Sequence, residues 1–217
     1  MTASENTQGN FLVRLLKSEG LLGAIVAILS VLTAFMGYQG ALTDAKASEH
    51  ELNAQRTLSI ANREYLDVGQ LVVLDFISYD NYFASLGVDD EAAENYAASF
   101  SDPLIDNLER EAIFDETYYE EMYGDALVCF DEADDLFILG EATGGVAEGY
   151  QLAMFVFAVG LAMAAWASLL GGKSNVRLLF SIMALVSLTW GLIAYSFIVT
   201  DISLIPAEVV KSCLETM

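Results

Sequence analysis

The chain has 217 residues, a formal net charge of −22 and a hydrophobic content of 55%. A charge this negative argues against nucleic-acid binding, which requires a basic surface. Residues 41–148 hold 26 acidic and four basic side chains, whereas the rest of the chain holds five of each, so charge and hydropathy occupy different segments. The acidic segment is also rich in aromatic residues, which excludes a disordered acidic tail. We therefore expect an all-α integral membrane protein that carries a folded acidic domain.

Residues 1–20 are predicted to be a cytoplasmic amphipathic segment. Within them, residues 10–18 place the bases Arg14 and Lys17 among apolar side chains, a pattern typical of a helix that lies on a membrane surface. Residues 21–40 follow as the first predicted transmembrane helix, because roughly 20 apolar residues are needed to cross a bilayer. We interpret this helix as a retained anchor rather than a cleaved signal peptide.

Residues 41–148 are predicted to form an acidic α-helical domain outside the cytoplasm. Apolar residues recur every three or four positions from Leu58 to Leu86, which is the helix period. The first transmembrane helix is therefore expected to continue outward as a long stalk, and shorter helices then bring the chain back. One short helix is predicted to be capped by Asp89 or Asp90 and to end at Phe100, and the next is predicted to begin at Asp102 and Pro103. A turn is then predicted to end at Gly124, and a last helical segment to run from Asp125 to Leu139.

Residues 149–170 and 178–200 are predicted to be the second and third transmembrane helices, since neither stretch contains a charged side chain. Residues 171–177 join them as a short cytoplasmic turn, and residues 201–217 form an extracytoplasmic tail. Trp190 falls near the middle of the third helix, so we expect it to pack between helices.

The orientation follows from basic residues, which stay in the cytoplasm when they flank short loops. Two of them, Arg14 and Lys17, precede the first helix. Two more, Lys173 and Arg177, lie in or beside the predicted turn. We therefore expect a multi-pass protein of the cell membrane with a cytoplasmic N-terminus, whereas residues 41–148 and the C-terminus are extracytoplasmic.

Small residues recur at helix spacing in all three predicted transmembrane helices. In lipid, small side chains let helix backbones approach closely and gain dispersion contacts. The pattern leaves two alternatives open, packing of the three helices within one chain and contact between subunits of a homo-oligomer. The residues concerned are Gly23, Ala27, Gly160, Ala164, Ser187 and Gly191.

The chain has two cysteines, Cys129 and Cys213, and both are predicted to lie outside the cytoplasm. That compartment permits a disulfide. An apolar stripe in the tail, with Val209 and Leu214 beside Cys213, is suited to docking on the acidic domain. A disulfide between the two cysteines and a pair of buried free thiols are both consistent with the sequence.

Clusters of acidic residues in the domain are expected to attract cations, because hard cations prefer several carboxylate ligands. Their spacing is not that of a calcium-binding loop, so we expect weak and diffuse attraction rather than a defined metal site. Repulsion between so many like charges opposes a compact fold, so we expect the outside medium to be salty, rich in divalent cations, or acidic. The low lysine count fits a halophile. The residues concerned are Asp131, Glu132, Asp134, Asp135, Glu116 and Glu120.

Two motif matches are rejected as chance similarity. Residues 167–174 satisfy a relaxed phosphate-loop pattern, but a transmembrane helix rather than a strand precedes them. Residues 131–134 spell a helicase signature on the opposite side of the membrane. The sequence offers no spacing typical of a metal site or a catalytic nucleophile, so neither enzymatic activity nor a cofactor is expected.

The predicted transmembrane helices contain hydroxyl side chains but no ionisable groups, which argues against a transporter or a pump. We therefore predict a non-enzymatic integral membrane protein whose acidic helical domain binds a partner or serves as an accessory or structural subunit. Its expected partners are the lipid bilayer, other copies of itself or another membrane subunit, and cations. The alternative is a homo-oligomeric channel that favours cations and uses the acidic domains as an extracytoplasmic vestibule.

Overall fold

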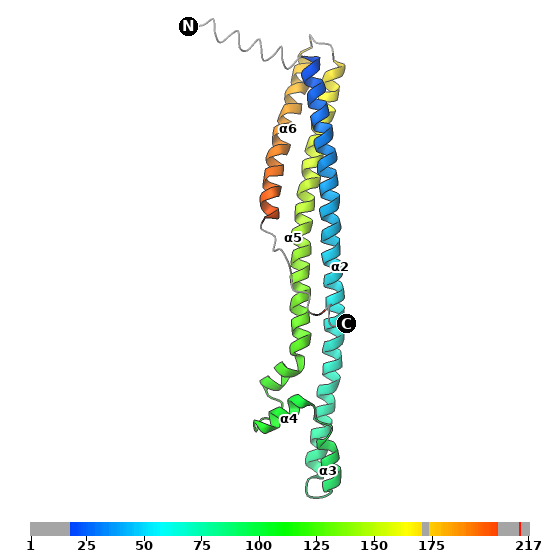
Figure 1. Ribbon diagram of the computed structural model, residues 1–217, viewed down its shortest axis with the longest axis vertical. Coiled ribbons are helices and arrows are strands. Elements are labelled where there is room, and N and C mark those ends of the chain that lie inside the picture. Colours follow the sequence, from blue (N-terminus) through cyan, green and yellow to red (C-terminus); the bar gives the residue numbers. More distant parts are fainter. Residues whose placement is uncertain (1–17, 171–173, 204–212, 214–217) are drawn as a thin grey trace, which may run out of the picture. The chain divides into compact units, whose positions relative to one another are not determined.

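The structure, a computed structural model, describes residues 18–170, 174–203 and 213. The regular structure of these residues is entirely helical, which confirms the all-α prediction (Figure 1). The amphipathic segment with Arg14 and Lys17, the turn residue Lys173 and most of the predicted tail lie outside the described residues. The helices are α2 (Glu19–Ser85), α3 (Asp90–Ala97), α4 (Asp102–Glu109), α5 (Glu116–Leu169) and α6 (Asn175–Ile202).

Side chains cap the short helices where the sequence predicted that they begin. The Asp89 carboxylate accepts a hydrogen bond from the backbone N–H of Ala92 at the start of α3, which satisfies one of the free donors of a helix end. At the start of α4, Ser101 is the capping residue and Pro103 occupies the first turn. The predicted end of α3 at Phe100 is wrong by three residues, because the helix ends at Ala97.

The prediction that the chain turns at Gly124 is also wrong. Helix α5 runs without a break from Glu116 to Leu169, through Gly124 and Asp125 and into the second apolar stretch. A glycine inside a helix costs only about 1 kcal/mol relative to alanine. Burial of nearby side chains on the same helix, such as those of Tyr118 and Ala126, outweighs that cost.

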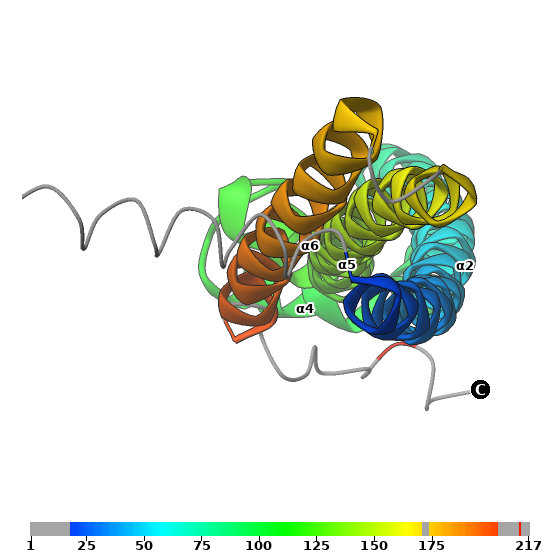
Figure 2. The same ribbon diagram turned by 90° about the horizontal axis from the view of Figure 1, so that it is seen from above.

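The described residues divide into two compact units, and both α2 and α5 contribute to each. Unit 1 contains residues 18–49 and 139–203, whereas unit 2 contains residues 50–138 and Cys213. In unit 1, α2, α5 and α6 pack around a core of apolar side chains that includes Leu29, Phe157 and Ala184 (Figure 2).

Two glycines allow α5 and α6 to pack closely in unit 1. A Cβ atom built on Gly191 would lie 2.4 Å from a ring carbon of Phe157, and one built on Gly160 would lie 2.8 Å from the Cβ of Ser187. No side chain larger than glycine fits at either position without a shift, so these two glycines allow the contact.

Each long helix contains a stretch that is long and apolar enough to cross a membrane. The most apolar windows of α2, α5 and α6 have mean hydropathies of 2.2, 2.1 and 2.0. Only 22%, 28% and 17% of the residues in these windows are buried, so most of their apolar side chains face outward. On α6, Trp190 exposes 64% of its surface, so the prediction that it packs between helices is wrong for the helices of one chain.

Arg177, expected as a charge in the turn, is instead almost fully buried, with 2% of its surface exposed. Its Nη1 donates a hydrogen bond of 3.1 Å to the carbonyl oxygen of Leu170, just beyond the end of α5. The last carbonyl groups of a helix lack partners within the helix, and a cation there also complements the helix dipole. Arg177 therefore links the start of α6 to the end of α5.

Candidate functional site

The candidate site is unit 2, the acidic helical part of the chain. Its core joins three helices, because Val72 of α2, Leu104 of α4 and Tyr118 of α5 are all buried against one another. Helices α3 and α4 form the return between α2 and α5 (Figure 1).

Aromatic rings fasten the segment between α4 and α5 to α2. The ring of Phe114 stacks on that of Phe76 with centroids 3.9 Å apart, and it meets the rings of Tyr79 and Tyr118 edge-on. Phe114 has a φ of 53°, in the left-handed region that bulky residues rarely adopt. The ring contacts, each worth about 0.5–1.5 kcal/mol beyond burial, help to hold this strained backbone.

A buried carboxylate, that of Asp75 on α2, organises the same region, although only 2% of its surface is exposed. Its Oδ1 accepts a hydrogen bond of 2.9 Å from the backbone N–H of Ser101, and its Oδ2 accepts from the hydroxyl groups of Ser101 and Tyr118. The three donors satisfy a charge that would otherwise be costly to bury. Asp75 therefore fixes the starts of α4 and α5 on α2.

Tyr118 is fully buried and donates to Asp75 over 2.8 Å. Burial raises the pKa of its hydroxyl well above the usual value of 10.0, and the hydrogen bond to Asp75 raises this pKa further. The hydroxyl therefore remains a donor at any pH near neutrality.

Asp115 caps the start of α5. Its Oδ1 accepts hydrogen bonds from the backbone N–H of Tyr118 and from the amide of Asn107, a fully buried residue of α4. The bond from Tyr118 is the main reason why the pKa of Asp115 is lowered from its usual value of 3.8. The cap thus joins α4 to α5 next to the Asp75 network.

A disulfide joins α5 to the C-terminal part of the chain. The sulfur atoms of Cys129 and Cys213 are bonded, and the backbone N–H of Cys213 donates to Glu132 Oε2 at 3.0 Å. Both cysteines pack against the buried Ala61 of α2. The sequence left a disulfide and two free thiols open, and the structure has the disulfide.

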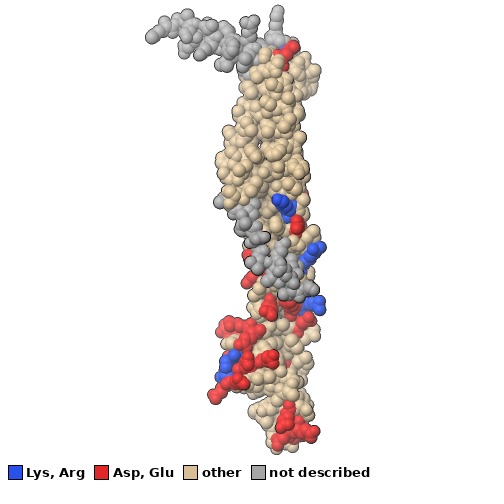
Figure 3. Space-filling model, viewed as in Figure 1, with Lys and Arg blue, Asp and Glu red and all other residues tan. Residues whose placement is uncertain are grey.

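The acidic residues expected to attract cations do not converge. On α5, Asp131, Asp134 and Asp135 are exposed, whereas Glu132 is buried and points toward Cys213. Acidic side chains gather on the visible face of unit 2, around the return helices and α5 (Figure 3). In the part of the chain that the structure describes, no three His, Cys, Asp or Glu side chains are placed to share a metal ion.

The small residues predicted for helix packing fall into two groups. Gly160, Ala164 and Gly191 are buried in the core of unit 1, and Ser187 is half-buried against Gly160. Gly23 and Ala27 are exposed, and no atom lies within 4 Å of a Cβ built on Gly23. The structure thus brings the α5 and α6 residues together but leaves those of α2 on the outside of the chain.

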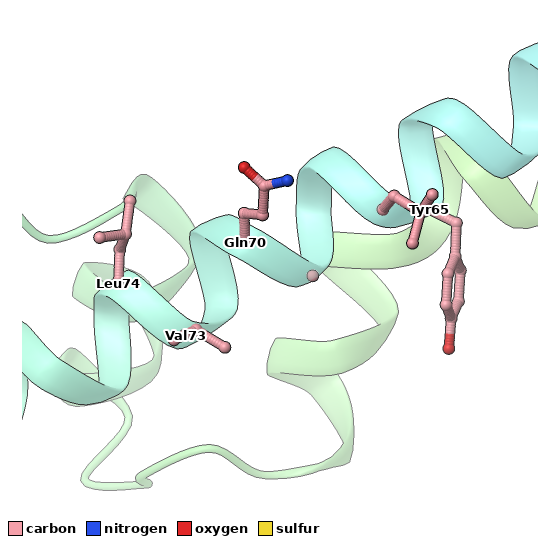
Figure 4. A pocket seen from close by; sticks show the side chains of 6 residues that line it. Tyr65, Gln70, Val73 and Leu74 are labelled. Carbon is pink, nitrogen blue, oxygen red and sulfur yellow. The ribbon is translucent and has the colours of Figure 1, made fainter.

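Sequence reasoning missed an apolar groove on the outer face of α2 in unit 2. The hollow has a volume of about 520 Å³. Of the residues that line it, Gln70 and Leu74 project to one side of α2, and Val73 and Tyr65 project to the other (Figure 4). The sequence contains a hint of this groove, because residues 68–74 are an uncharged stretch inside the acidic domain. The residues that line the groove are Tyr65, Leu66, Gly69, Gln70, Val73 and Leu74.

Comparison of the chain with protein families, with curated proteins and with solved structures finds no match.

Proposed function

We propose that the chain is an integral membrane protein that uses its three apolar helices to hold unit 2 outside the cytoplasm, where unit 2 binds a partner or serves as a subunit of a membrane assembly. The observation that carries this proposal is the outward direction of the apolar side chains in unit 1. Leu152, Phe155, Trp190 and Phe197 each expose 62–65% of their surface. Large apolar patches are rare on the surfaces of proteins dissolved in water, and a bilayer would cover these exposed side chains.

Unit 2 supports the second half of the proposal. A buried network around Asp75 joins α2 to the starts of α4 and α5, and the acidic side chains of α5 remain outside that network. An ordered scaffold with a dense negative surface favours a basic partner or a second membrane subunit, because complementary charge speeds encounter and selects partners.

The test of membrane anchoring is extraction of isolated membranes with alkaline carbonate, followed by proteolysis of intact cells. We expect the chain to stay with the lipid and a Glu-specific protease to cleave unit 2 from outside. Release into the carbonate wash would contradict membrane anchoring. Protection of unit 2 in intact cells, with cleavage after lysis, would reverse the orientation.

The test of partner binding compares the wild type with a variant in which Asp131, Asp134 and Asp135 are changed to Asn. These side chains are exposed, so we expect the helix content to be unchanged. Cross-linking in intact cells should capture a defined partner with the wild type and less of it with the variant. Equal capture by both proteins would show that this surface does not select the partner.

The salt dependence of stability tests the halophile-like interpretation. Because salt screens repulsion over a Debye length of about 10 Å at 0.1 M, the melting temperature of the purified chain should rise with NaCl concentration. A melting temperature that is flat from low to multimolar salt and insensitive to Ca²⁺ would rule this interpretation out.

The cation channel has less support. The span hydroxyl groups of Thr33, Ser181 and Ser196 donate to carbonyl oxygens of their own helices, which leaves fewer donors to line an aqueous pore. Cation flux into liposomes that contain the purified chain would establish the channel in spite of this.

A further inference from the structure

The groove on α2 has the form of a socket for a side chain of another helix. Four of its lining residues, Leu66, Gly69, Gln70 and Val73, are spaced i, i+3, i+4 and i+7. In coiled coils, four residues at this spacing form the hole that receives one side chain of the facing helix. Gly69 contributes no side chain to this hole, and the Tyr123 hydroxyl of α5 lies 3.6 Å from the place that a Cβ on Gly69 would take.

The same face continues along the helix as a narrow seam. Leu66, Gln70, Val73 and Ile77 recur at alternating intervals of four and three residues, the spacing of a coiled-coil interface. The apolar members of the seam, Leu66, Val73 and Ile77, expose 65%, 55% and 53% of their surfaces, so the described part of the chain leaves more than half of each uncovered. The seam is therefore available for a partner helix.

Gln70 indicates what that partner is. Under an apolar partner its amide would be buried without a hydrogen bond, at a cost of about 1–3 kcal/mol. An amide is both donor and acceptor, so two copies of Gln70 can satisfy each other across a two-fold axis. A single polar residue of this kind is known to fix register and subunit number in coiled coils. The seam of one copy is thus complementary to the seam of a second copy.

Membrane anchoring strengthens the argument. Two copies inserted in one membrane present α2 in the same direction and at the same height, which is the parallel alignment that places Gln70 opposite Gln70. In that register the hole of one copy receives the Gln70 side chain of the other. We infer that unit 2 forms a parallel homodimer through the α2 seam of Leu66, Gln70, Val73 and Ile77. The inference rests on the proposed anchoring of the chain and names a second copy as the partner.

The test uses two matched variants of the full chain in detergent, Val73→Glu in the seam and Val128→Glu on α5. The two valines are almost equally exposed, at 55% and 56%, so each glutamate should leave the helix content unchanged by circular dichroism. Native mass spectrometry should show a dimer for the wild type and for Val128→Glu. For Val73→Glu, two facing carboxylates should raise the dimer dissociation constant at least about tenfold.

Engineered cysteines test the register in membranes. Gln70→Cys should give a disulfide-linked dimer on mild oxidation, whereas Glu94→Cys on the exposed side of α3 should not. A monomeric wild type, equal dissociation of both glutamate variants, or a helix of another protein seated in the groove of a monomeric chain would each overturn the inference. Carbonate extraction of the same samples reports separately on membrane anchoring, so a failure of the dimer is distinguishable from a failure of the proposed function.

Discussion

Tyr118 and Asp75 lie 43 positions apart in the sequence, and the Tyr118 hydroxyl donates a hydrogen bond of 2.8 Å to Asp75 Oδ2 inside unit 2. Because this bond and those from Ser101 converge on one carboxylate, the starts of α4 and α5 depend on the same residue of α2. The placement of α4 and α5 on α2 is therefore sensitive to a single buried carboxylate.

Tyr118→Phe removes one of the donors to Asp75 and leaves the ring in place. Oδ2 of Asp75 then keeps only the bond from the Ser101 hydroxyl, so we expect the free energy of unfolding to fall by about 1.5–3 kcal/mol, the usual contribution of a hydrogen bond to a charged group. Tyr119→Phe is the control, since that side chain is 37% exposed and a surface change is usually worth less than about 0.5 kcal/mol. Equal losses in urea unfolding of the two variants would show that the bond to Asp75 contributes nothing.

The loss of unfolding free energy at acid pH should depend on Asp115. Its pKa in the folded state lies below the usual 3.8, so its contribution is fully present above that value and is lost as the pH falls through the folded pKa. Asp115→Asn keeps an oxygen that can accept from Tyr118 but does not titrate. Its unfolding free energy should therefore fall less steeply below pH 3.8 than that of the wild type, whereas exposed Asp125→Asn should follow the wild type.

Two glycines should respond to alanine with opposite signs. Gly87 has a φ of 73°, so Gly87→Ala should cost about 1–2 kcal/mol. Gly124 lies inside α5 with no atom near its Cβ position, so Gly124→Ala should stabilise by about 0.5–1 kcal/mol. If the chain turned at Gly124, as its sequence suggested, thermal unfolding would show a loss for Gly124→Ala as well.

The disulfide should stabilise unit 2 by constraining the unfolded chain over a separation of 84 residues. Cys129→Ser and Cys213→Ser should each lower the unfolding free energy by about 2–4 kcal/mol. The double variant should lose no more than either single one, because both remove the same bond. Losses that add, or an intact mass that does not change on treatment with reductant, would mean that the thiols are free.

The helix period and the capping residues predicted much of the fold, because both are local features of the sequence. Continuous α2 and the starts of α3 and α4 follow from them. The burial of Asp75 and Arg177 was not predictable, since each is buried by partners that the folded chain brings to it. The sequence placed Arg177 in a turn as a topology signal, but its partner, the Leu170 carbonyl oxygen, exists only because α5 ends beside it.

Alanine variants of Gly191 and Gly23 should distinguish packing within one chain from contact between chains. Gly191→Ala would place a Cβ 2.4 Å from the Phe157 ring, and overpacking of this kind typically costs about 1–3 kcal/mol. The Cβ of Gly23→Ala meets nothing within 4 Å, so this variant should melt like the wild type or slightly higher. Thermal unfolding in detergent at two protein concentrations distinguishes the two kinds of contact. The loss in Gly191→Ala should not depend on concentration, because Gly191 and Phe157 belong to one chain, whereas a concentration-dependent loss in Gly23→Ala would place the exposed face of α2 against another subunit.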